Sequence, residues 1–219
     1  MATAQELLDE IAAEVRVCQK CPLYKGTKNG VPGEGSAQSE VMFIGEGPGF
    51  HEDRQGRPFV GPAGQFLNEL LASIGLDRST VFITNVVKHR PPENRDPLPE
   101  EITACGEYLT RQIAALNPKV IVTLGRFSMA RFFPNARIGV IHGQAKKIDG
   151  RIVVAMYHPA AALHQSSLRQ TVEEDFRRAI PAALAEARRL AAEGKLASQT
   201  DQQGERKDDS PPPQQLSLF

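Results

Sequence analysis

The stretch VMFIGEGPG (residues 41–49) is an apolar run that ends in a glycine-rich turn. Two later stretches have the same form, VFITNVVKHRPP (residues 81–92) and RIVVAMYHPAAAL (residues 151–163). Short apolar runs rich in β-branched residues and bounded by Gly or Pro are typical of buried strands. Because ligands bind at the carboxyl ends of strands in an open parallel sheet, the polar residues at these ends should share one crevice. These residues are Glu46, Asn85 and His158.

Segments with a helical spacing of apolar residues lie between the predicted strands. We expect helices over residues 1–16, 61–76, 99–116 and 168–193. KVIVTLG (residues 119–125) predicts another central strand, and residues 138–158 predict a hairpin or strand pair that leads to His158. Strands that alternate with helices favour parallel pairing through right-handed crossovers, so the sequence predicts an α/β fold.

The composition is that of an ordinary globular protein. Of 219 residues, 41% are hydrophobic, and 26 basic residues balance 26 acidic ones. No apolar stretch approaches the roughly 20 residues of a membrane span, and the acidic N-terminus is unlike a signal peptide. We therefore expect a cytoplasmic monomer that does not contact membranes. Zero net charge neither supports nor excludes nucleic-acid binding, which depends on a local patch.

The C-terminal segment differs in character from the rest of the chain. After about residue 194 it is polar and proline-rich, and it lacks a core-forming pattern. Such a segment cannot bury enough apolar surface to fold alone. We expect a folded domain over residues 1–194, a disordered linker over 195–213 and a short functional tail over 214–219.

Each polar residue also has a plain structural interpretation. GEGPG could cradle a phosphate or form a simple tight turn, and it lacks P-loop spacing. Phe59 could stack on a flat base or belong to the core. The Asn85 amide could match the O4 and N3–H edge of a pyrimidine or cap its own loop, and His158 could be structural. The recurrence of polar residues at equivalent strand ends favours a shared site.

The three cysteines indicate either a metal site or plain thiols. Cys18 and Cys21 form a C-x2-C pair, and Cys105 lies far along the chain. An odd number without an export signal argues against a disulfide scaffold. Three thiols cannot complete four-ligand coordination, and His89, in the loop after the second strand, is the natural fourth candidate. The alternative is three buried free thiols and a surface histidine.

Together these motifs resemble the uracil-DNA glycosylase superfamily, most closely its iron–sulfur family 4. The resemblance spans about residues 5–190 and rests on GEGPG with EDRQGRPFVG, TNVVKHRPPENRDP, HPAAAL and the cysteines. It implies a three-layer α/β/α fold with a central four-stranded parallel sheet. It also implies a monofunctional base-excision repair enzyme that flips uracil from DNA and hydrolyses the N-glycosidic bond, leaving an abasic site.

The resemblance assigns roles around the base. Phe59 stacks on the extruded uracil, Asn85 reads its edge, and His158 donates to O2 as the uracil anion forms. Glu52 lies near uracil C5. Leu163 or His164, in a loop that wedges into the duplex, fills the gap left by the flipped base.

On the sugar side, the resemblance assigns the backbone of the GEGPG loop, including Gly45 and Gly47. Gly47 stands where one branch of the superfamily has a water-activating Asp. Another acid, Glu46, should therefore orient the water, or the site relies on stabilising the uracil anion. Lys88 is the nearest amine in sequence, but nothing in the sequence marks it as desolvated, so we expect no lyase activity.

The same resemblance implies a 4Fe–4S cluster held by Cys18, Cys21, Cys105 and His89. Family 4 usually has KCRPP where this chain has KHRPP, and His at that position also occurs in the DNA-cross-linking family X. Family X adds a basic insertion with a reactive His, which this chain lacks. Turnover is therefore favoured over cross-linking. If His89 does not ligate, the site would hold zinc or no metal.

The segment QLSLF (residues 215–219) resembles the short motif by which bacterial repair and replication proteins bind the sliding clamp. Apolar anchors and a hydrogen-bonding Gln on an unstructured tether suit such binding, although a short apolar tail could arise by chance. A clamp contact would place the protein at the nucleoid. The proposed contact residues are Gln215, Leu216, Leu218 and Phe219.

Two other functional classes stay open at this point. A protein that binds or traps uracil DNA with little turnover would use the same pocket. An electron-transfer protein would need the cluster but not the pocket residues.

Overall fold

Six strands form one sheet in the computed structural model, which describes residues 2–194, and their order is β1-β3-β2-β4-β6-β5. The strands β3, β2, β4 and β6 are mutually parallel, whereas β1 and β5 pair antiparallel at the two edges. The central four-stranded parallel sheet is thus confirmed, with two edge strands in addition. The bounds are β1 Glu34–Gly35, β2 Val41–Gly45, β3 Phe82–Asn85, β4 Val120–Leu124, β5 Gln144–Ile148 and β6 Arg151–Met156.

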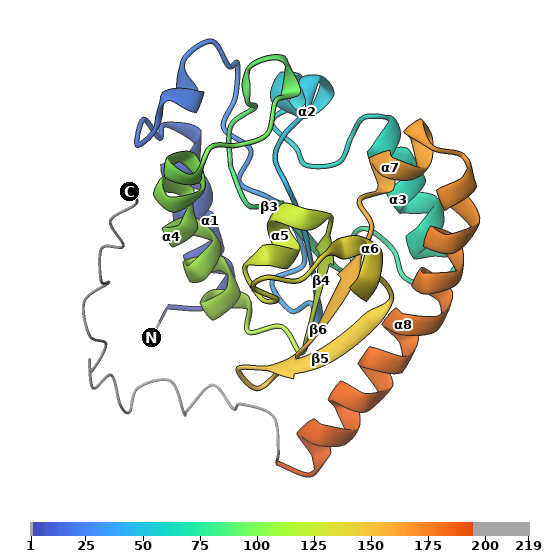
Figure 1. Ribbon diagram of the computed structural model, residues 1–219. Coiled ribbons are helices and arrows are strands. Elements are labelled where there is room, and N and C mark those ends of the chain that lie inside the picture. The colour runs from blue at the N-terminus through green and yellow to red at the C-terminus, as the bar shows by residue number, and fades with distance from the viewer. Residues whose placement is uncertain (1, 195–219) are drawn as a thin grey trace, which may run out of the picture.

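Helices cover both faces of this sheet (Figure 1). The alternation of side chains along each strand divides the core, because successive residues point to opposite faces. Phe43 on β2 packs in the cluster that includes α3 and α8, whereas Met42 packs in the cluster that includes α1 and α4. The helices are α1 Ala4–Arg16, α2 Phe50–Gln55, α3 Pro62–Ala72, α4 Pro99–Leu116, α5 Arg126–Ala130, α6 Ile138–Ile141, α7 Pro159–His164 and α8 Ser167–Ala192.

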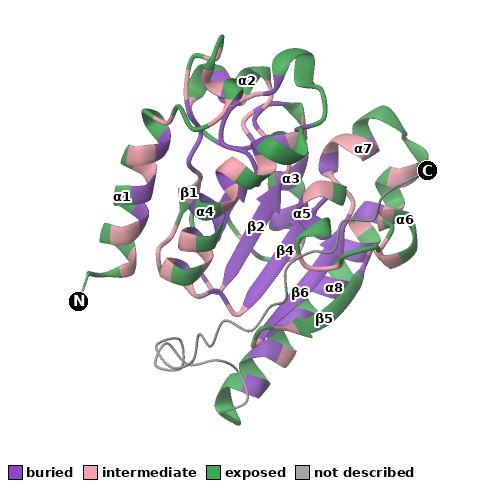
Figure 2. Cartoon of the chain, turned by 60° about the vertical axis from the view of Figure 1, so that its left-hand side comes forward, coloured by how far each residue is buried: buried purple, intermediate pink, exposed green. Residues whose placement is uncertain are grey.

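The inner strands are buried along their whole length, as Figure 2 shows. Their β-branched residues suit a parallel sheet covered on both sides. The edge strand β5 is exposed and carries two adjacent lysines, which disfavour pairing with another sheet. No helix in residues 2–194 combines the length and apolar character needed to cross a membrane.

Two segments differ from the sequence-based expectation. Residues 138–141, expected in a hairpin or strand pair, form the short helix α6, whereas the hairpin itself is confirmed as β5 paired antiparallel with β6. Residues 159–164, predicted as a loop, form the short helix α7. Pro159 occupies its first turn, where a missing N–H costs nothing, and His158 is its N-cap. The parallel strands bring the ends of β2, β3 and β6 to a single edge of the sheet, beside α2 and α7 (Figure 1).

Candidate active site

A cavity of about 400 Å³ opens at the carboxyl edge of the sheet. Asn85 lies at the end of β3, and its backbone pairs with Gly45 of β2. Gly45 and Leu163 do not line the cavity, although the residues that follow them, Glu46 and His164, do. The residues predicted from the sequence that line the cavity are Glu46, Gly47, Glu52, Phe59, Asn85, His158 and His164.

The Asn85 amide is prepared to bind a ligand. The residue is only 1% exposed, and its Oδ1 has no hydrogen-bond partner. A Cβ on Gly45 would collide with this oxygen and would lie 2.6 Å from Cζ of Phe59. Gly45 therefore allows both side chains to approach the strand. Since buried polar atoms are nearly always paired, the orphaned Oδ1 indicates an acceptor for a ligand N–H.

His158 is held as a neutral imidazole with a defined tautomer. Its Nδ1 accepts a hydrogen bond from the Ala160 backbone N–H at 3.1 Å. Burial lowers the pKa of His158 to about 4, although the Glu52 carboxylate opposes this shift. With Nδ1 as an acceptor, the ring proton is on Nε2, which becomes a hydrogen-bond donor. The ring also stacks on Phe59, with centroids 5.4 Å apart.

This protonation state gives a testable pH dependence. With a pKa of about 4 for His158, the excision rate should show no loss as pH rises from 5.5 to 8 through the ordinary histidine value. The unfolded state binds the additional proton between about pH 6.5 and 4, so stability should fall as pH decreases through that window. Single-turnover rates and melting curves across these pH values check both. A rate that halves near pH 6.5 in the wild type, but not in His158→Asn, would indicate an imidazolium donor instead.

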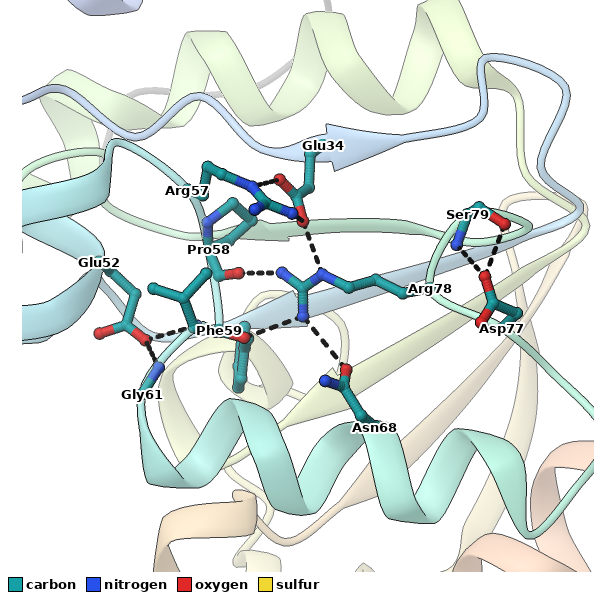
Figure 3. A network of polar contacts seen from close by, with 11 residues as sticks. Glu34, Glu52, Arg57, Pro58, Phe59, Gly61, Asn68, Asp77, Arg78 and Ser79 are labelled. Carbon is teal, nitrogen blue, oxygen red and sulfur yellow. Dashed lines mark hydrogen bonds and ion pairs between the residues drawn. The ribbon is translucent and has the colours of Figure 1, made fainter.

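The Phe59 loop is strained and is held by its neighbours (Figure 3). Phe59 has φ of +50°, a left-handed conformation that is rare for a non-glycine residue. Arg78 donates to the carbonyl oxygens of Phe59, at 2.8 Å, and of Pro58. The Arg78 guanidinium is itself paired with Glu34 at 2.6 Å. Such strain persists only where the surroundings over-determine it, so Arg78 positions the aromatic ring.

Glu52 anchors the same loop from the other side. Its Oε1 accepts hydrogen bonds from the backbone N–H groups of Val60 and Gly61, both at 2.8 Å (Figure 3). Its Oε2 accepts from the Gly49 N–H at 3.1 Å, which closes the glycine-rich turn onto α2. Both carboxylate oxygens are thus engaged with the backbone. A position of Glu52 near uracil C5 stays a prediction, and its observed contacts are those of a positioning residue.

Glu46 has the properties of a base at the mouth of the cavity. Burial raises its pKa, and the negative charge of Asp96 raises it further, while Arg126 opposes the shift. A raised pKa brings a carboxylate closer to the range suited to proton transfer. At Gly47, a Cβ would lie 2.7 Å from Cγ2 of Val87, so a longer side chain there would require a shift. A role of Glu46 in orienting the attacking water stays a prediction.

The model of the Uracil DNA glycosylase superfamily matches residues 32–183, which include all the cavity residues described above. The chain belongs to this superfamily. It is 49% identical over 183 residues to the type-4 uracil-DNA glycosylase of Archaeoglobus fulgidus, covering 79% of this chain and 92% of that protein. It is 52% identical to the type-4 enzyme of Saccharolobus solfataricus, covering 78% and 84%, and 43% identical to that of Thermotoga maritima, covering 82% and 96%.

The environment of Lys88 differs from the sequence-based expectation. The sequence did not mark it as desolvated, yet the side chain is fully buried, and burial lowers its pKa to about 7. Its Nζ donates to Thr84 Oγ1 at 2.8 Å, to the Asn85 carbonyl at 2.8 Å and to Gln112 Oε1 at 2.7 Å. These acceptors take all three ammonium protons, and Lys88 does not line the cavity. It is therefore a positioning residue below Asn85, not an amine nucleophile.

The three cysteines are neighbours in the folded chain. Cys21 and Cys105 are close enough to shift each other's pKa, and Cys18 raises the pKa of both through its charge. Burial raises the pKa of Cys105 to about 11. Thiols gathered in this way suit soft metals and iron–sulfur clusters. Within residues 2–194, however, no three or more His, Cys, Asp or Glu side chains meet the geometry of a metal site.

The position of His89 leaves its ligation a prediction. The side chain is 4% exposed, and burial lowers its pKa, which keeps the imidazole neutral as a metal ligand must be. Its Nε2 faces Gly30, where a Cβ would lie 3.1 Å away. The same Cβ would collide with the Val15 carbonyl oxygen, so Gly30 allows the end of α1 and the His89 ring to pack together.

The predicted wedge residues lie on α7. Leu163 is 44% exposed, an unusual position for a large apolar side chain, while His164 lines the cavity. A short helix capped by His158 holds both more rigidly than a loop would. The role of these residues in DNA stays a prediction.

Proposed function

We propose that this chain excises uracil from DNA as a monofunctional glycosylase. The observation that carries the proposal is the pairing, in one cavity, of an orphaned Asn85 Oδ1 with a neutral His158 that presents Nε2–H. One group accepts and the other donates, which matches the N3–H and O2 atoms of uracil. The type-4 uracil-DNA glycosylase relatives support the same substrate.

The chemistry follows from where charge develops. Cleavage of the N1–C1′ bond leaves an oxocarbenium-like sugar and a uracil anion, whose charge spreads to O2. The His158 donor stabilises this charge without losing its proton, while Asn85 Oδ1 holds N3–H. Glu46 orients a water whose oxygen bonds to C1′, and the water proton passes to the carboxylate. Preformed donors aimed at developing charge make the largest single contribution in many enzymes.

An oligonucleotide with one uracil tests the proposal. We expect an abasic site, seen as alkali-dependent strand cleavage, in both single-stranded and duplex DNA, and no cleavage without alkali. Thymine and cytosine controls should stay intact. Absence of excision, or a band stable in SDS at the size of a protein–DNA adduct, would instead favour the binding or trapping alternative.

We further propose that Cys18, Cys21, Cys105 and His89 hold a 4Fe–4S cluster. The gathered thiols and the neutral, buried His89 support this ligand set. Because the cysteines come from the segment after α1 and from α4, a cluster would join these elements and so stabilise the loop before β1. An imidazole in place of a thiolate also removes one negative charge and raises the reduction potential.

Substitution of His89 tests the fourth ligand. His89→Cys should keep iron and visible absorption, because a thiolate restores the usual donor. His89→Ala should lose iron or become oxygen-labile, measured by iron content and absorbance of freshly purified protein. His164→Ala, on α7, is the matched control and should keep full iron content. Full iron content in His89→Ala would exclude ligation by His89.

We also propose that residues 215–219 bind a sliding clamp and that residues 195–213 act as a tether. Both segments lie outside the described residues, so support comes from the QLSLF sequence alone. A random-coil tether of about twenty residues has a reach of roughly 25 Å, enough to hold an enzyme beside clamp-encircled DNA at the nucleoid.

Deletion of residues 215–219 should leave excision on short oligonucleotides unchanged and abolish clamp binding. Tethering raises local concentration without altering the active site, so the two measurements should separate. Native clamp affinity in a Leu218→Ala, Phe219→Ala variant would contradict this role.

A further inference from the structure

Phe50 is an exposed aromatic side chain at the rim of the uracil cavity. Few large apolar residues among residues 2–194 are exposed, and Phe50, at 48%, is the aromatic one. It is the first residue of α2, and its neighbours Gly49 and Glu52 both line the cavity. A single exposed apolar side chain is ordinary on a protein surface, so the significance of Phe50 lies in the charged groups that surround its ring beside the cavity.

Two arginines lie against this ring. The guanidinium carbons of Arg54 and Arg90 are each 5.4 Å from the Phe50 ring centroid. Arg90 also donates to Asn94 Oδ1 at 2.7 Å, and Asn94 lines the cavity. Many arginines of this chain are paired with carboxylates, but within the described part of the chain no ion pair involves Arg54 or Arg90.

An aromatic ring flanked by guanidinium groups that have no carboxylate partner among the described residues fits single-stranded nucleic acid. Bases of any type stack on aromatic rings, and guanidinium groups bind the phosphates between them. A protein or lipid partner that covered only the ring would not require two cations without a carboxylate partner beside it. The positive charge and the aromatic surface therefore favour binding of the DNA strand whose uracil enters the cavity.

We propose that Phe50, Arg54 and Arg90 form a stacking site for an unpaired base that neighbours the flipped uracil, with the arginines on adjacent phosphates. The proposal rests on the proposed function, because it requires a DNA strand at the cavity. It is separate from Leu163, which lies on α7, whereas Phe50 begins α2 (Figure 1). An unpaired neighbouring base is available in single-stranded or frayed DNA, so this site favours such substrates.

Fluorescence tests the contact directly. The chain contains no tryptophan, so Phe50→Trp introduces a single reporter. Titration of the full-length variant with uracil-free single-stranded DNA should quench it saturably. Ala191→Trp, at an exposed position in the last turn of α8 and far from the cavity, is the control and should not respond. An unquenched Phe50→Trp overturns the proposal.

Kinetics test whether the contact matters for the reaction. Phe50→Ala and Phe50→Leu should lower kcat/KM for uracil in single-stranded DNA about tenfold, from the loss of one base stack, while Phe50→Tyr keeps the wild-type value. The loss should be smaller in duplex DNA. Wild-type kcat/KM in Phe50→Leu overturns the proposal even if the tryptophan is quenched, because an apolar contact without a stack would then suffice.

Salt dependence tests the arginines. Arg54→Gln and Arg90→Gln should each reduce the slope of log affinity against log salt by about 0.7 for single strands. An unchanged slope in both variants would remove the phosphate contacts from the proposal. Binding of uracil-free DNA does not require excision, so these results differ from a failure of the proposed function, which would appear as a wild-type enzyme that leaves uracil in place.

Discussion

Asn85→Ala is expected to lower the single-turnover rate of uracil excision by about 100-fold or more. The substitution removes the side-chain amide, whose Oδ1 has no hydrogen-bond partner in the protein. The backbone carbonyl of residue 85 keeps its hydrogen bond from Lys88. Removal of one preorganised polar contact to the reacting group typically costs 10²–10³ in rate, or about 3–4 kcal/mol. Because Oδ1 makes no hydrogen bond within the protein, the melting temperature should change little.

His158→Ala provides the second arm of this experiment. It removes the Nε2 donor and also the N-cap acceptor for Ala160, so the rate should fall well over tenfold with a modest loss of stability, about 1 kcal/mol. His142→Ala, at a histidine outside the cavity lining, controls for the general effect of removing an imidazole. Near-wild-type rates in both Asn85→Ala and His158→Ala would show that other groups bind the uracil.

Local sequence patterns predicted the strands and their ends well. Residues 41–45 and 151–156 are short apolar runs with clear boundaries, and buried parallel strands require little else. The edge strands were less evident for a physical reason. β1 has only two residues, and β5 is an exposed polar strand whose pairing depends on β6. A pattern based on buried apolar residues cannot detect β1, and β5 was anticipated only as one arm of the hairpin that leads to His158.

The side chains that hold the Phe59 loop in place could not be predicted from the sequence. Arg78 reaches the Phe59 loop across 19 residues, and Glu52 binds backbone groups whose position depends on the turn itself. Nothing local distinguishes these side chains from surface charges. The left-handed Phe59 is likewise a result of tertiary contacts. The polar residues at the strand ends could be inferred from the sequence, whereas the residues that orient them are evident only in the folded structure.

The burial of Lys88 likewise could not be inferred from the local sequence. Its substitution is expected to have the largest effect on stability. Lys88→Ala should lower the free energy of unfolding by about 3–5 kcal/mol. It removes the ammonium donor to Thr84 Oγ1, the Asn85 carbonyl and Gln112 Oε1, which keeps only the Thr84 hydroxyl at 3.2 Å, and it also opens a cavity. Lys146→Ala, on the exposed strand β5, should change stability by less than about 0.5 kcal/mol.

Denaturant unfolding of both variants measures this difference, and excision at a temperature where Lys88→Ala is still folded measures its consequence. The Asn85 carbonyl loses its anchor in that variant, so the amide should sample more orientations and the rate should fall although Asn85 and His158 are intact. Gln112 stays attached to the Pro32 carbonyl at 2.6 Å, so the loop before β1 should keep its place. A Lys88→Ala enzyme as stable as the Lys146→Ala control would mean that water replaces the ammonium at little cost, and that the buried charge does not position Asn85.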